Sequence, residues 1–112
     1  MVTGGGPLNN CFGTPCTNEL VEFTRDQLKT SGSPTPAVTI KSTGPDSSGS
    51  LWGPYALAFT ADGDAWVSNY DKPTTVEFAE EQLSKSGAPT PIRTIAGPDT
   101  GMNWPSYVVT VP

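Results

Sequence analysis

A duplicated segment constrains the fold of this chain more than any other feature of the sequence. Residues 21–40 (VEFTRDQLKTSGSPTPAVTI) match residues 76–95 (VEFAEEQLSKSGAPTPIRTI) at 12 of 20 positions without a gap. A Gly-Pro-Asp turn and then a tryptophan, Trp52 or Trp104, follow each copy. A repeat with a period in the low fifties is typical of a unit of several short strands that stacks on its neighbours.

The one complete unit predicts four antiparallel strands. Its segments are apolar or alternate apolar with polar residues, as half-buried strands do, and Asp62-Gly63 is a hairpin turn signal between the first two. The expected strands are residues 55–61, 64–70, 74–78 and 92–95. Four such strands make one blade of a β-propeller, so the expected fold class is all-β, built of four-stranded antiparallel propeller blades, two blades' worth per chain.

The two ends of the sequence divide a second blade between them. The first unit offers strand candidates near residues 8–12 and at 19–24 and 37–41, but no first strand. Residues 106–111 (SYVVTV) match the first strand of the complete unit and have no successors. The expected division is an incomplete three-stranded blade (8–41), a complete blade (55–97) and the lone first strand of a blade that another copy completes (104–112).

Two stretches of the repeat resemble a known class of propellers. Residues 59–70 (FTADGDAWVSNY) and 21–40 look like the blades of bacterial NHL-type and gluconolactonase-like β-propeller proteins. The resemblance covers roughly residues 19–111 and implies a propeller architecture. It does not imply one activity, because such propellers include lactonases, lyases and plain binding scaffolds. The chain departs from the class by having about two blades instead of a full ring, and by a Gly-rich stretch where the first unit should carry its second strand.

Two blades alone would expose both outer sheet faces and leave edge strands unpaired. We therefore expect the chain to be its own partner, in a ring where residues 106–111 of one copy pair beside residues 8–12 of the next. Three copies would give six blades and four would give eight, and the trimer is favoured. The alternatives are a piece of a longer propeller chain and a self-contained β-sandwich.

Charge and hydropathy exclude two kinds of partner. The chain has six Lys and Arg, eleven Asp and Glu and no His, which gives a formal net charge of −5. Phosphate contacts need clustered basic residues, so no nucleic-acid partner is expected. No apolar run approaches the roughly 20 residues that span a bilayer, so no membrane partner is expected. The first residues lack the features of a signal peptide. An extracellular or periplasmic location is nevertheless slightly favoured over others.

Cysteine and acidic residues offer little for a cofactor. Cys11 and Cys16 flank four residues and can close a local disulfide, with two free thiols as the alternative. Two cysteines without His fall short of a zinc site. The Asp62-Gly63-Asp64 triplet supplies two carboxylates where calcium takes six to eight oxygens, so a turn is favoured. No cofactor is expected, with a divalent cation such as calcium as the alternative that the lactonase-like resemblance implies.

The expected function is a noncatalytic binding or scaffold module that recognises a small molecule or glycan at the channel face of the propeller. No catalytic residue is assigned, because most triads and general-base schemes need His. The ligand-binding candidates are aromatic and amide side chains in the linkers and at the ends of strands: Trp52, Tyr55, Asn69, Tyr70, Asn103 and Trp104. The alternatives are a metal-dependent lactonase- or lyase-like enzyme and a fragment with no separate activity.

Three further residues carry structural expectations. Trp66 lies inside a strand and is expected in the core. Both copies of the loop after the third strand keep a Gln-Leu pair while their charges change. Leu28 and Leu83 are therefore expected to anchor the two loops against apolar surface.

Overall fold

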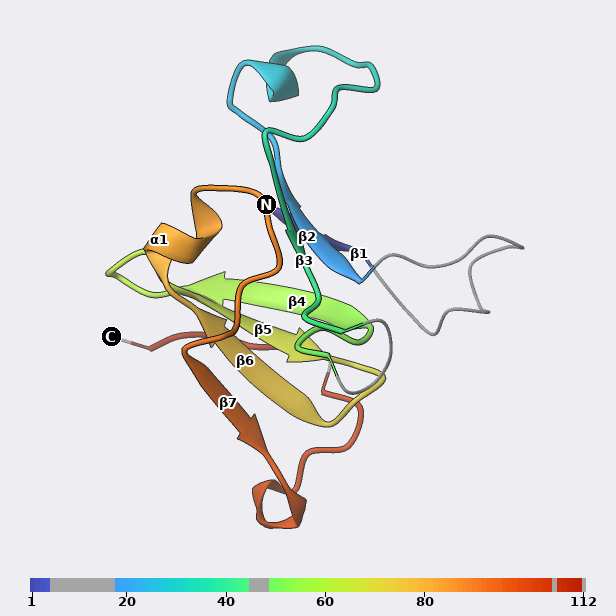
Figure 1. Ribbon diagram of the computed structural model, residues 1–112, viewed down its shortest axis with the longest axis vertical. Coiled ribbons are helices and arrows are strands. Elements are labelled where there is room, and N and C mark those ends of the chain that lie inside the picture. The colour runs from blue at the N-terminus through green and yellow to red at the C-terminus, as the bar shows by residue number, and fades with distance from the viewer. Residues whose placement is uncertain (5–17, 45–48, 106, 112) are drawn as a thin grey trace, which may run out of the picture.

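The structure is a computed structural model that describes residues 1–4, 18–44, 49–105 and 107–111, and it is mostly β with little helix (Figure 1). A three-stranded antiparallel sheet has the order β1-β2-β3, and a four-stranded one has the order β4-β5-β6-β7. The strands are β1 Val2–Gly4, β2 Glu19–Glu22, β3 Val38–Lys41, β4 Pro54–Phe59, β5 Ala65–Asn69, β6 Thr74–Phe78 and β7 Arg93–Ala96. The helical turns are η1 Gln27–Lys29, α1 Glu80–Leu83 and η2 Pro98–Thr100. The described helices are all too short to cross a bilayer.

The second sheet follows the sequence prediction closely. Its four strands lie where the complete unit predicted them and pair in sequence order, so the all-β, antiparallel part of the prediction is confirmed. The Asp-Gly hairpin between β4 and β5 is also present. Gly63 has a φ of 92°, and its N–H donates to Thr60 O at 3.1 Å, which closes the turn.

The first sheet differs from the prediction at one edge. β2 and β3 lie within the predicted ranges, and residues 8–12, the expected second strand, lie outside the described residues. On the side away from β3, the described neighbour of β2 is β1, which pairs with it antiparallel from Val2 opposite Val21. This strand was not predicted, because three residues ahead of a Gly-rich stretch give too short a pattern.

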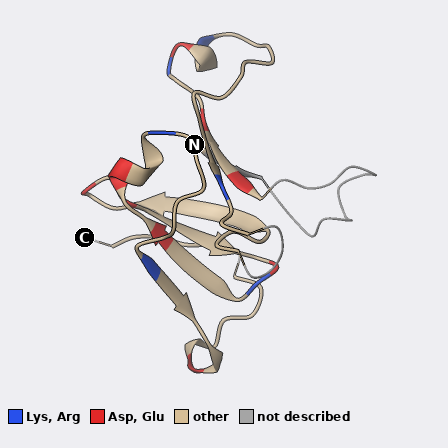
Figure 2. Cartoon of the chain, viewed as in Figure 1, with Lys and Arg blue, Asp and Glu red and all other residues tan. Residues whose placement is uncertain are grey.

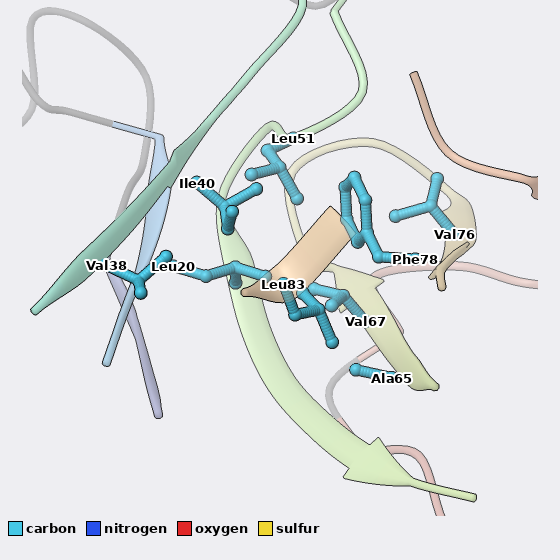
Figure 3. Packing of buried hydrophobic residues seen from close by; sticks show 9 residues of the cluster. All are labelled: Leu20, Val38, Ile40, Leu51, Ala65, Val67, Val76, Phe78 and Leu83. Carbon is cyan, nitrogen blue, oxygen red and sulfur yellow. The ribbon is translucent and has the colours of Figure 1, made fainter. Parts of the chain in front are cut away.

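The two sheets pack face to face around one apolar cluster (Figure 3). Its members come from β2, β3, β5, β6 and α1 and from the linker into β4: Leu20, Val38, Ile40, Leu51, Ala65, Val67, Val76, Phe78 and Leu83. Alternate residues of a strand face opposite sides, so the buried residues of β5 and β6 define the inner face of the second sheet. The first sheet covers that face.

The sheets are stacked in the same orientation. Ile40 lies in the cluster and faces the second sheet. Its counterpart in the repeat, Ile95, lies opposite Thr75, whose neighbour Val76 faces the cluster. Ile95 therefore faces away from the cluster, and it is 46% exposed. The same face of each unit points in the same direction, so the second sheet follows the first as the next member of a stack.

Trp66 is not part of the core, and that expectation was wrong. Ala65 and Val67 on either side of it are fully buried in the cluster. Strand alternation therefore directs Trp66 to the outer face of the second sheet, where it is half-buried opposite Ala58 and Glu77.

The repeat builds the same loop twice. In the first loop, Gln27 accepts from Thr24 N–H at 2.8 Å and donates to Thr35 O at 2.6 Å. In the second, Gln82 accepts from Ala79 N–H at 2.8 Å and donates to Thr90 O at 2.6 Å. The glutamine kept in both copies is thus a bridge across the loop, a role that the sequence analysis did not assign.

The leucine that follows this glutamine is buried in only one copy. Leu83 is 5% exposed and packs in the cluster, so its predicted role as an anchor is confirmed. Leu28 is 69% exposed, so the same prediction was wrong for the first loop. The second loop lies against the first sheet, whereas the first loop projects away from both sheets (Figure 1).

Replacing Leu83 with Ala should cost about 2–5 kcal/mol of folding stability, because it removes buried methyl groups and leaves a cavity between the sheets. The matched change Leu28→Ala should cost less than about 0.5 kcal/mol in the monomeric chain. Urea unfolding of dilute protein measures both. Equal losses would contradict the different environments of the two leucines.

Candidate functional site

Three tyrosines gather where β4 begins and β5 ends. The rings of Tyr55 and Tyr70 lie 5.5 Å apart between centroids at an interplanar angle of 31°. Tyr107, from the C-terminal segment, meets Tyr55 edge-on at 5.9 Å and 85°. Both spacings fall in the range of favourable aromatic pairs. All three rings are exposed, so together they form an aromatic surface, called here the tyrosine cluster.

Tyr55 and Tyr70 are among the ligand-binding residues predicted from the sequence, and Tyr107 is not. The segment that holds Tyr107 was considered only as a strand. The signal that could have found it is the repeat itself, because it places this segment next to the equivalent strand β4. Thr110 confirms that arrangement, since its hydroxyl donates to Phe59 O at 2.7 Å. Residues 107–111 therefore run alongside β4 in the same direction, from Tyr55 towards Phe59.

Asn69 holds the linker into β4. Its side chain is fully buried; Oδ1 accepts from Trp52 N–H at 3.1 Å, and Nδ2 donates to Ser50 O at 3.0 Å and Thr74 Oγ1 at 2.9 Å. Both amide hydrogens are therefore used within the chain. Tyr70 N–H also donates to Gly53 O at 2.8 Å, which fixes the base of the tyrosine cluster.

The two repeated tryptophans have different surroundings. Trp52 is half-buried, and its backbone is bonded to Asn69. Trp104 is 68% exposed and has a φ of 48°, while its neighbour Asn103 is also exposed. Thr75 donates to Met102 Sδ at 3.5 Å and ties this second linker to the outer face of the second sheet. The structure thus brings Trp52, Asn69 and the tyrosines to one end of the sheet, and it leaves Trp104 in the solvent.

Two acidic residues of the second unit, Asp64 and Glu77, have structural partners. Asp64 Oδ1 accepts from Glu80 N–H at 3.0 Å, at the first residue of α1. Glu77 is 4% exposed and accepts from Arg93 Nη1 at 2.6 Å, and this bond raises the pKa of Arg93 above its ordinary value. No group of three or more His, Cys, Asp or Glu side chains converges among the described residues. Cys11 and Cys16 lie outside those residues.

Charged residues are distributed over several loops and strands (Figure 2). Arg25 and Lys29 lie on the first loop, and the other basic residues lie on separate strands and loops. A shallow groove of about 390 Å³ lies along residues 81–82 and 85–89, away from the tyrosine cluster. The candidate site is therefore an open aromatic surface, suited to stacking on a flat ligand.

Replacing Asn69 with Ala should cost about 2–4 kcal/mol, because it removes three hydrogen bonds and leaves buried backbone groups without partners. The matched change Asn103→Ala removes an exposed amide and should cost less than about 0.5 kcal/mol. Thermal unfolding followed by circular dichroism measures both. A stable Asn69→Ala protein would show that the linker is held by other contacts.

No protein-family model, no curated protein and no solved structure matches this chain. The resemblance to NHL-type and gluconolactonase-like propellers thus remains a prediction from sequence motifs. A function for the chain has to be argued from the geometry of its own residues.

Proposed function

We propose that this chain is a noncatalytic binding or scaffold module of the β-propeller type, assembled from copies of itself, with a ligand surface at the tyrosine cluster. The observation that carries the proposal is the stacking of the two sheets in the same orientation. In a sandwich, the apolar faces of two sheets oppose each other and close the core. Here the outer face of the second sheet has the orientation of the inner face of the first, so a further sheet would cover it as the second sheet covers the first.

The C-terminal segment supports the same interpretation. It lies beside β4 and runs parallel to it, as the first strand of a third sheet would. Tyr107, Val109 and Val111 are about four-fifths exposed, and residues 107–111 belong to no strand. An extended apolar segment with unpaired backbone groups favours addition to the edge of another sheet.

The first sheet offers the matching edge. Its order leaves one side of β1 without a partner strand among the described residues. Residues 106–111 of one copy would pair with β1 of the next, in place of the partner at residues 8–12 that the sequence predicted. Each copy would then complete one four-stranded blade of its neighbour, and three or four copies would close a ring of six or eight blades.

The tyrosine cluster is the proposed ligand surface. It combines three exposed rings with a rigid base, because Asn69 and Gly53 fix the backbone beneath it. Stacking on a sugar ring needs aromatic faces and tolerates an absence of charge. The proposed ligand class is accordingly a neutral glycan or another flat small molecule.

Deletion of residues 106–112 should convert a trimer or tetramer into monomers, because each neighbouring sheet loses its shared strand. Analytical ultracentrifugation measures the mass. The matched variant Thr110→Val keeps the strand and removes only the hydroxyl bonded to Phe59 O, so it should assemble like the parent. A deleted protein that assembles normally would rule out strand sharing.

Tyr55→Ala combined with Tyr70→Ala should lower glycan affinity by at least about tenfold, since stacked rings supply most of the contact. A neutral oligosaccharide panel with saturation-transfer NMR detects the binding. Phe59→Ala, an exposed aromatic at the far end of β4, should bind normally. Undiminished binding in the double variant would place the ligand elsewhere, and binding lost on chelation would favour the metal-dependent alternative.

A further inference from the structure

The two units of the chain are joined by a backbone contact at the free edge of β3. Gly87 O accepts from Lys41 N–H at 2.8 Å, and Gly87 N–H donates to Thr39 O at 3.1 Å. Ser86 Oγ accepts from Thr39 N–H at 3.0 Å. The second loop thus satisfies the outward backbone groups of an edge strand and covers that edge.

The chain carries the same edge a second time, uncovered. β7 pairs with β6 in the register with which β3 pairs with β2, since Thr94 lies opposite Val76 as Thr39 lies opposite Val21. The backbone groups of Thr94 and Ala96 therefore point outwards, as those of Thr39 and Lys41 do. No described residue beyond the sheet bonds to them, and all four residues of β7 are exposed.

The chain also carries the covering loop a second time. Ser31-Gly32 of the first loop corresponds to Ser86-Gly87 of the second. The glutamine bridges have equal lengths in both loops, so the first loop shares this part of the conformation, although Gly32 lacks the positive φ of Gly87. Leu28, Ser31 and Gly32 are nevertheless exposed. The chain therefore has a second strand edge of this kind, β7, that no described loop covers. It also has a second loop of this kind, the first loop, that covers no described edge.

The surface next to β7 has an apolar patch for Leu28. Ile95 corresponds to Ile40, which shares the buried cluster with Leu83, and Trp66 lies half-buried on the same face as Ile95. Arg93 replaces Val38 on this face, but its guanidinium is paired with the Glu77 carboxylate. An incoming leucine would meet the aliphatic part of a neutralised pair and an indole ring, both of which can pack against it.

We propose that a second copy of the chain docks on β7 through the loop of its first unit. Ser31 and Gly32 of the incoming copy bond to the outward groups of Thr94 and Ala96, and Leu28 packs on Ile95 and Trp66. This inference rests on the proposed self-assembly and adds its second contact. The same copy can make both contacts, because the C-terminal segment and β7 border one outer face of the second sheet.

Engineered disulfides test the contact directly. In a chain with Cys11→Ser and Cys16→Ser, the pair Ser31→Cys and Thr94→Cys should cross-link different copies on oxidation with copper phenanthroline. The matched pair Thr39→Cys and Ser86→Cys reproduces the internal contact and should close within one chain. Non-reducing electrophoresis separates the two results: a ladder of multimers for the first pair and a single monomer band for the second. A monomer band for both pairs would overturn the docking proposal.

A charge at the leucine gives an independent measurement. Leu28→Asp should raise the dissociation constant of the assembly by at least about tenfold, because it places a charged group in the apolar contact with Ile95 and Trp66. Thr30→Asp adds the same charge two residues away. Thr30 corresponds to Lys85 of the second loop, which stays exposed beside the first sheet, so this variant should assemble like the parent. Sedimentation velocity across a concentration series measures both.

The outcomes separate the two proposals. A parent protein that stays monomeric at every concentration overturns self-assembly and the docking contact together. A parent that assembles and depends on residues 106–112, while Leu28→Asp changes nothing and the intermolecular disulfide does not form, overturns the docking contact alone. Loss of assembly in Leu28→Asp together with the multimer ladder supports it.

Discussion

The structure depends on a simple requirement: each sheet needs another sheet against its apolar face. Leu20 and Ile40 are fully buried only because the second sheet lies over the first. The loop carrying Leu83 extends the same contact to the edge of β3. A short sheet with one face in water buries too little apolar surface to be stable alone, so the contact between units stabilises both.

The repeat shows how position in the stack decides burial. Leu28 and Leu83 each follow a glutamine that makes the same bridge across its loop, yet one is 69% exposed and the other 5%. Ile40 and Ile95 differ in the same way. Local sequence specifies the conformation of each unit, and the neighbouring unit supplies the burial. Each unit has one surface that fits the opposite surface of the next unit. The first unit and the last unit therefore each leave one such surface, with its apolar residues, exposed.

Much of the secondary structure could be predicted, because its signals are local. The Asp-Gly turn and the alternation in β4, β5 and β6 identify a hairpin and its register. Trp66 could not be placed by type alone, since alternation assigns it to the face opposite Val67. Asn69 looked like a ligand-binding residue because it ends a strand near aromatic residues. Its three bonds to the chain identify a structural role, and two of them reach a linker 17 to 19 residues away in the sequence.

The geometry of the internal junction also bears on the size of the assembly. A head-to-tail contact between copies closes only when the rotation from unit to unit divides a full turn, and otherwise it yields an open filament. If copies repeat the internal junction, every sheet follows the preceding one by one rotation, of about 60° for six sheets and about 45° for eight. That rotation is set inside each chain by the side chains between the two sheets. The core around Leu83 and Phe78 would then determine the number of copies in the ring. The contact surfaces between copies would repeat the rotation that this core sets.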